Sequence, residues 1–376
     1  MNNVYITSTS SFFPHEPVGN DEIEAVLGMI GGRPSRARRI ILRNNGITSR
    51  HYAIDRASGK PSMSNAQLTA QAIRGLALQQ PAEVLATGTS TPDQLLPNHG
   101  VMVHGELGWD CLEVASTAGV CLSGATALKY AYLSVKAGEA QSAIASGSER
   151  VSPQLLASQF EAESEHKVRE LEERPEIAFE KDFLRWMLSD GAGALLLENQ
   201  PRGPLSLKIR WVELFSYAHL LPACMYAGAE KNSDGSLTGW ADMSSSQHAE
   251  KSVFAIKQDV RLLNENVIRL TAFEPLKVLQ QKHQLTSEKV DWFLPHMSSC
   301  YFAEPLAKDF AAAGLPISPE KWFTNLTTRG NTGSASPYIM LDELFRSGRI
   351  EKGQTLLLYI PESGRFSTGF VYLEAV

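Results

Sequence analysis

Apolar and polar positions along the chain follow two periods, one typical of strands and the other of helices. Every second position is apolar from Leu205 to Trp211, which is the pattern of a half-buried strand. Apolar residues at helical spacing predict helices over residues 67–78, 122–136 and 256–270. Short apolar runs predict further strands at residues 4–7, 83–88, 112–115, 142–147, 191–197, 290–294 and 355–360. Strands that alternate with helices in this way indicate a layered α/β fold.

The strand–helix–strand order occurs twice, once in residues 1–200 and again in residues 201–376. This repetition predicts two halves of similar architecture. Residues 154–187 interrupt the first half, because they are rich in Glu, Lys and Arg with interspersed Leu, Phe and Trp. Two interpretations stay open for this segment: a solvated helical excursion, or a cap over the substrate entrance.

Bulk composition narrows the class of protein. Hydrophobic residues make up 43% of the 376 residues and charged residues 20%, which is typical of a soluble globular protein. The net charge of -6 argues against nucleic acid as a partner. The amino terminus lacks a basic and apolar leader, and no apolar run is long enough to span a membrane, so we expect a cytoplasmic protein. The four cysteines show no metal-binding spacing and are expected to be reduced thiols: Cys111, Cys121, Cys224 and Cys300.

Cys121 could carry chemistry. It lies among small residues, in AGVCLSGATAL, where a predicted strand gives way to a predicted helix. At a helix amino terminus the dipole and free N–H groups lower the pKa of a thiol, which favours a thiolate nucleophile. The alternative is a buried structural thiol, because free cysteines are among the most buried residue types.

Three further residues are candidates for the same chemistry. His296 follows an apolar strand, the position at which α/β enzymes keep catalytic groups, although a structural histidine is the alternative. Asn331 lies in a loop of glycine and small hydroxyl residues, where its amide could donate to an oxyanion or simply form a turn. Gly364 follows a buried strand, where its N–H could approach a ligand closely or serve an ordinary turn.

Taken in order, seven segments resemble the β-ketoacyl-acyl carrier protein synthase III family, a branch of the thiolase-like condensing enzymes. The segments are GITSRHYAI, GTSTPDQLLPNHG, AGVCLSGATAL, SDGAGALLL, VDWFLPHMSS, RGNTGSASPYIML and GRIEKGQTLLLYIPESGRFSTG. The order of a Pro-His strand end, a Gly-Asn-Thr loop and a terminal glycine turn is specific as a set.

This resemblance implies a duplicated αβαβα sandwich and a homodimer. It implies that Cys121 carries the acyl group, that His296 and Asn331 promote decarboxylation of a malonyl-type extender, and that the N–H groups of Cys121 and Gly364 form the oxyanion hole. The substrates would be acyl-CoA or acyl-carrier protein thioesters. Neither a metal nor a redox cofactor would be needed.

The chain also departs from the family pattern. CLSGATAL has one more residue between Cys and Gly than usual, Met297 and Ser298 stand where Gln and Ala are common, and Arg365 replaces a glycine. The region around residues 28–46 lacks the tryptophan that often stacks on coenzyme A. These differences argue against an acetyl-CoA priming role. They favour a secondary-metabolism ketosynthase, such as the dialkylresorcinol type that joins two fatty-acyl-derived chains.

Two other functions remain as alternatives to condensation. The first is acyl transfer to an amine or hydroxyl without decarboxylation, which would need Asn331 less. The second is a non-catalytic subunit that binds a condensing partner. Such subunits typically lose a catalytic residue, whereas this sequence keeps Cys121, His296 and Asn331.

Overall fold

A nine-stranded mixed sheet organises the protein, in a computed structural model that describes residues 2–35, 37–160 and 184–376. The strand order is β13-β14-β15-β8-β1-β7-β6-β4-β5. The first half of the chain contributes β1 (Tyr5–Phe12), β4 (Val84–Thr89), β5 (Glu113–Ala118), β6 (Ser142–Glu149) and β7 (Gly191–Glu198). The second half contributes β8 (Leu207–Ser216), β13 (Trp292–Pro295), β14 (Thr355–Glu362) and β15 (Ser367–Ala375).

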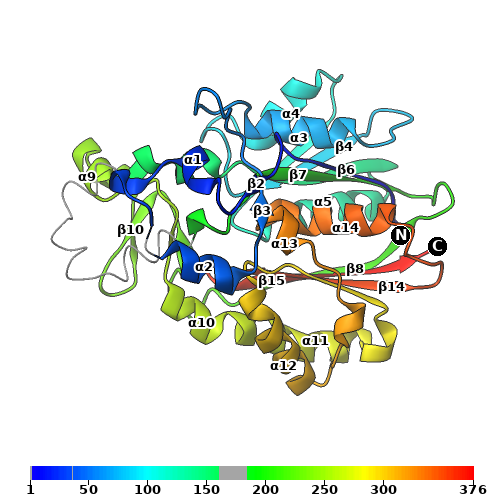
Figure 1. The fold of residues 1–376 in the computed structure, drawn as a ribbon. Coiled ribbons are helices and arrows are strands. Elements are labelled where there is room, and N and C mark those ends of the chain that lie inside the picture. The colour runs from blue at the N-terminus through cyan, green and yellow to red at the C-terminus, as the bar shows by residue number, and fades with distance from the viewer. Residues whose placement is uncertain (1, 36, 161–183) are drawn as a thin grey trace.

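The sheet folds back on itself where β1 meets β8, through the pairs Tyr5–Lys208 and Ile6–Leu207. Helices α5 (Ser123–Ala137) and α14 (Ser336–Arg346) lie between its two halves (Figure 1). One outer face is covered by α3 (Asn65–Arg74) and α4 (His99–Leu107), and the other by α10 (Val260–Ile268), α11 (Glu274–His283) and α12 (Ala303–Ala312). The layers therefore run helix, sheet, helix, sheet, helix, which confirms the expected thiolase-like αβαβα sandwich.

The middle layer is the centre of the hydrophobic core. Met340, Leu341 and Leu344 of α14 belong to one buried cluster with residues of both half-sheets, including Leu195 and Val371. Helix α14 is buried almost all round, which is the pattern of a helix sandwiched between two sheets. Because both central helices start next to the candidate catalytic loops, this core also sets where those loops lie.

Short elements complete the fold. They are the helices α1 (Ile23–Leu27), α2 (Arg38–Asn45), α6 (Ser152–Leu155), α9 (Ser245–Glu250) and α13 (Leu326–Arg329), and the strands β2 (Val18–Gly19), β3 (Ser49–Arg50), β9 (Met225–Tyr226), β10 (Ala229–Lys231), β11 (Leu237–Gly239) and β12 (Lys257–Gln258).

Several boundaries differ from those that the sequence pattern predicts. The helix expected over residues 256–270 begins only at Val260, because the Asp259 side chain accepts the Leu262 N–H and caps the helix. Residues 257 and 258 instead form β12. Strand β5 extends to Ala118, so the small residues after the predicted strand continue it. Strand β15 was not predicted.

The charged segment at 154–187 is described only at its two ends. Residues 161–183, on which both interpretations of an excursion or a cap depend, lie outside the described residues. At the described ends, Leu155, Phe160 and Trp186 are buried in the protein. Both described ends of the segment are therefore packed into the fold.

Candidate active site

Cys121 lies in the turn between β5 and α5, where two cavities meet. The first cavity encloses about 480 Å³ including the solvent at its mouth, and the second about 530 Å³ measured in the same way. Cys121, Ser298 and Ser363 line both. The structure thus places the candidate nucleophile in the wall that the two cavities share.

The two cavities separate the other two candidate residues. His296 lines the first cavity, together with the apolar side chains Leu263, Val267, Ile268, Met297, Phe302 and Leu306. Asn331 lines the second, which also receives Ser90, Glu149, Met187, Leu188, Met225, Ile256 and Gln258. Both cavities therefore offer apolar walls, and each brings one candidate polar group to the side of Cys121.

His296 is held at the end of β13 by its backbone, since its N–H donates to the Tyr359 carbonyl on β14 at 2.8 Å. The residue is 2% exposed, and burial lowers the pKa of its imidazole to about 4. The ring is therefore neutral at pH 7. Its Nδ1 atom has no hydrogen-bond partner among the described residues, so no neighbour fixes the tautomer.

Asn331 lies between α13 and α14 and is fixed by three hydrogen bonds. Its N–H donates to the Met187 carbonyl and its carbonyl accepts the Ser189 N–H, each at 2.9 Å. Its side-chain Oδ1 accepts the Gly333 N–H at 2.9 Å. This bond fixes the orientation of the side-chain amide and leaves Nδ2 as a donor for a ligand.

The N–H groups of Cys121 and Gly364 are both free to bind an anion, since neither donates to an oxygen of the described residues. The Gly364 carbonyl is held by the Cys224 N–H at 2.8 Å, which orients the turn. A Cβ at position 364 would lie 2.9 Å from Val120 Cγ2, so only glycine allows the turn to approach the Cys121 loop this closely. This geometry suits an oxyanion hole.

The pKa of the Cys121 thiol differs from the expectation that the helix would lower it. Cys121 lies at the amino end of α5 as predicted, but burial raises the pKa of the Cys121 thiol, and the Glu362 and Glu149 carboxyl groups raise it further. They act in the direction opposite to the helix dipole, whose effect is confined to the first turn. The expectation of a lowered pKa was therefore wrong, and the resting thiol is protonated at neutral pH.

The two glutamates were missed by the sequence reading. Glu149 accepts hydrogen bonds from Ser90, Thr91 and the Ser334 N–H, and Glu362 accepts the N–H groups of Val120 and Leu122 at 3.1 Å. Burial raises the pKa of each carboxyl group. Each lies two residues beyond a strand that the sequence predicts, 142–147 or 355–360, and is the last residue of the strand in the structure, so the predicted strand end was the available signal for finding them.

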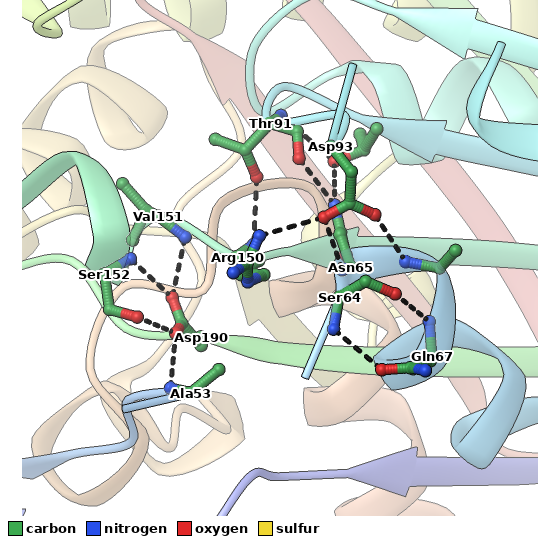
Figure 2. Close-up of polar contacts among 12 residues, drawn as sticks. Ala53, Ser64, Asn65, Gln67, Thr91, Asp93, Arg150, Val151, Ser152 and Asp190 are labelled. Atoms are coloured by element: carbon green, nitrogen blue, oxygen red, sulfur yellow. Dashed lines mark hydrogen bonds and ion pairs between the residues drawn. The ribbon is translucent and has the colours of Figure 1, made fainter. Parts of the chain in front are cut away.

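Two further carboxylates, Asp93 and Asp190, brace the residues that follow β4 and β6 (Figure 2). Asp190 accepts the N–H groups of Ala53 and Val151, each at 2.7 Å. Asp93 accepts the Asn65 N–H at 2.9 Å and pairs with Arg150 at 3.0 Å. Because these contacts fix the residues that follow β4 and β6, the Glu149 side chain has a rigid support.

Close packing then joins the loops of Cys121 and Asn331. A Cβ at Gly124 on α5 would lie 2.4 Å from the Ser334 carbonyl oxygen, and one at Gly147 on β6 would lie 2.3 Å from the same atom. No L side chain fits at such distances from backbone. Glycine at both positions therefore lets the loop of Asn331 and Ser334 sit directly against the start of the helix that follows Cys121.

The described parts of the chain contain neither a metal-binding cluster nor a membrane-spanning helix. No group of three or more His, Cys, Asp or Glu side chains there is placed to hold a metal ion. Nor does any helix described there combine the length and the apolar character needed to cross a membrane. No disulfide bond joins any two of the four cysteines, all of which lie among the described residues.

Comparison with known proteins connects this geometry to a family. Residues 280–372 match the family described as 3-oxoacyl-[acyl-carrier-protein (ACP)] synthase III C terminal. The chain is 24% identical over 376 residues to β-ketoacyl-[acyl-carrier-protein] synthase III of Xanthomonas oryzae pv. oryzae, covering 99% of this chain and 97% of that relative. The likeness thus spans both halves of the chain.

Solved structures share the same fold. A tetronic acid condensing enzyme superposes with a TM-score of 0.74 at 18% identity, covering 99% of both chains. OleA of Xanthomonas campestris, solved with lauric acid and lauroyl-CoA, superposes with a TM-score of 0.71 at 18% identity, again covering 99% of both chains. These similarities support the αβαβα architecture over the whole length.

Proposed function

Because the chain belongs to the β-ketoacyl-acyl carrier protein synthase III family of condensing enzymes, we propose that it joins a Cys121-bound acyl group to a malonyl- or β-ketoacyl-type thioester. The observation that carries this proposal is the place of Cys121. Its side chain borders one cavity with His296 and another with Asn331, beside two N–H groups that donate to no oxygen among the described residues.

The first step is acylation of Cys121. The protonated thiol must lose its proton as sulfur attacks the donor carbonyl, and the neutral imidazole of His296 in the same cavity is a base that can accept it. The N–H groups of Cys121 and Gly364 stabilise the oxyanion. The donor C–S bond then breaks, and the leaving thiolate takes the proton from the imidazolium.

The second step is formation of the carbon–carbon bond. Loss of carbon dioxide from a malonyl-type extender leaves an enolate, which an N–H of His296 and Nδ2 of Asn331 would stabilise. The enolate carbon attacks the acyl-Cys121 carbonyl and expels the thiolate, which takes a proton from solvent water. Since none of the described residues bonds to Nδ1 of His296 and fixes its tautomer, the ring can accept a proton in the first step and donate in the second. Both steps balance with protons alone, so we propose that no metal or redox cofactor takes part.

Apolar cavities on both sides of Cys121 favour fatty-acyl substrates. Leu263, Val267 and Leu306 line the first cavity, and Met187, Met225 and Ile256 the second. A fatty chain could therefore lie on either side of the reacting carbon. Lauroyl-CoA, which OleA binds, is a reasonable first donor, and acyl carrier protein, which names the family, is the alternative carrier.

The test is to incubate the protein with lauroyl-CoA and malonyl thioesters. Mass spectrometry should find the acyl group on the peptide of Cys121, and not in Cys121→Ala. Adding the extender should release a β-ketoacyl product. An adduct on a different cysteine, or an acylated Cys121 that no extender discharges, would contradict condensation. Transfer to an added amine without carbon dioxide release would favour the acyltransferase alternative.

We also propose that the chain forms a homodimer through β5. This strand ends the sheet, and its outer edge pairs with no other strand among the described residues. Leu133 on α5 is 49% exposed beside it, and Leu96, in the loop that leads into α4, is 85% exposed. An unpaired edge flanked by exposed leucines is a surface that a second copy can cover. Light scattering after size exclusion measures the mass directly.

A further inference from the structure

Glu362 and Glu149 occupy equivalent positions in the two half-sheets. Glu149 is the last residue of β6, which pairs in parallel with β4 and antiparallel with β7. Glu362 is the last residue of β14, which pairs in parallel with β13 and antiparallel with β15. The two strands have the same length of eight residues. The glutamates are therefore counterparts, and differences in their surroundings are informative.

Each glutamate reaches into the other half of the chain. Glu149 accepts the N–H of Ser334, three residues after Asn331, at 3.1 Å. Glu362 accepts the N–H groups on either side of Cys121, those of Val120 and Leu122, at 3.1 Å each. Each carboxylate thus holds the loop that carries a candidate catalytic residue of the opposite half.

The carboxylates of Glu149 and Glu362 differ in how many of their oxygens accept hydrogen bonds. Both oxygens of Glu149 accept hydrogen bonds, from Ser90, Thr91 and Ser334. In Glu362 only Oε2 has donors among the described residues, whereas Oε1 lies 3.3 Å from the place that a Cβ of Gly364 would take. Glu362 therefore lies between the two turns whose N–H groups would bind the oxyanion, with one oxygen uncommitted.

We propose that Glu362 is a positioning residue that fixes the Cys121 loop through two N–H contacts and, when its carboxyl group is ionised, places a negative charge beside the Cys121 sulfur. The inference rests on the proposed function of Cys121. Because Val120 and Leu122 donate to Glu362, the N–H between them stays free for the oxyanion. The charge disfavours the thiolate but not the neutral thioester, so it keeps the resting thiol protonated without opposing the acylated state.

The titratable groups that face this sulfur are few. Among the described residues, Glu362 comes from β14, Glu149 from β6, and His296 follows β13. The His296 ring is neutral at pH 7, and Glu149 is enclosed by its own donors. A change of charge at Glu362 should therefore show directly in the acidity of Cys121.

Two substitutions separate charge from position. Glu362→Gln keeps an oxygen that can accept both N–H groups but removes the charge. Glu362→Asp keeps the charge but shortens the reach. Glu351→Gln, at an exposed glutamate before β14, is the matched control for the chemical change.

The first measurement is the rate at which iodoacetamide alkylates the Cys121 peptide between pH 6 and 10, which needs no substrate. We expect Glu362→Gln to lower the apparent pKa of Cys121 by about one unit, giving about tenfold faster alkylation below that pKa. Glu362→Asp and Glu351→Gln should follow the wild-type profile. A Glu362→Gln profile that superimposes on wild type would overturn the charge effect.

The second measurement is acyl transfer from lauroyl-CoA to Cys121. We expect Glu362→Asp to slow it by about 10- to 100-fold, because the loop and its N–H shift, while Glu362→Gln retains most of the rate. Wild-type transfer in Glu362→Asp would overturn the positioning role. If wild-type Cys121 accepts no acyl group from any donor, the proposed function fails, yet the alkylation profiles still decide the role of Glu362.

Discussion

The neutral state of His296 has a consequence for stability that can be measured. Burial lowers the pKa of His296 from 6.5 to about 4 in the folded protein. Between these two values the unfolded chain binds a proton that the folded protein resists. Stability is therefore fully present above about pH 7 and falls as the pH drops through this window.

The size of the effect follows from the shift. A change of about 2.5 pKa units corresponds to about 3.4 kcal/mol once the pH is well below 4, and to about 2 kcal/mol by pH 5. Buried carboxyl groups with raised pKa, such as Glu149 and Asp190, act in the opposite direction. The pH dependence of wild-type stability therefore combines several groups. A comparison of variants is needed to obtain the contribution of His296.

Urea unfolding at pH 7.5 and pH 5.0 provides that comparison. We expect His296→Gln to lose about 2 kcal/mol less than wild type over this interval, because it has no imidazole to protonate. His219→Gln, at an exposed histidine, controls for the substitution itself. If His296→Gln lost as much stability as wild type, the folded ring would already be solvated or charged. Its role as a neutral base and donor would then be wrong.

Three further variants test other parts of the site and of the assembly. Gly364→Ala should slow acylation of Cys121 about 100-fold, because its Cβ would lie 2.9 Å from Val120 Cγ2; a wild-type rate at an unchanged melting temperature would refute the oxyanion role. Asn331→Asp keeps the acceptor for Gly333 but removes the donor, so product formation should fall about 100-fold while the adduct on Cys121 still forms; an equal loss of both would indicate a role in the loop alone. Leu133→Asp should halve the mass measured by light scattering, and an unchanged dimer would place the interface elsewhere.

The sequence pattern predicted the strands and helices whose periodicity is local. The strand after Leu205 alternates because one face packs on the core and the other faces outward, and the structure contains it as β8. Strand β15 was missed because Thr368, Gly369, Phe370 and Val371 are all buried, which removes the alternation. Periodicity thus finds elements with one exposed face more readily than those enclosed on both.

The chemistry of the site was predictable only where a local feature determines it. The turn before a helix correctly placed Cys121 at the start of α5. The direction of its pKa shift was wrong because the dominant causes are burial and carboxyl groups from β14 and β6. The residues that raise this pKa are distant in the sequence, so the segment AGVCLSGATAL contains no sign of them.

The contact between the two halves of the chain limits which residues can determine the choice of substrate. Gly124 and Gly147 both meet the Ser334 carbonyl at distances that no Cβ allows, so the contact between the Cys121 helix and the Asn331 loop tolerates little change. The apolar walls are less constrained, because Leu263 and Val267 extend from α10, outside this contact. A substitution such as Val267→Phe would shorten the cavity without moving Ser334. Substitutions on α10 should therefore change the acyl chain length that the first cavity accepts. The contact between the two halves, and with it the placement of the candidate catalytic residues, should stay the same.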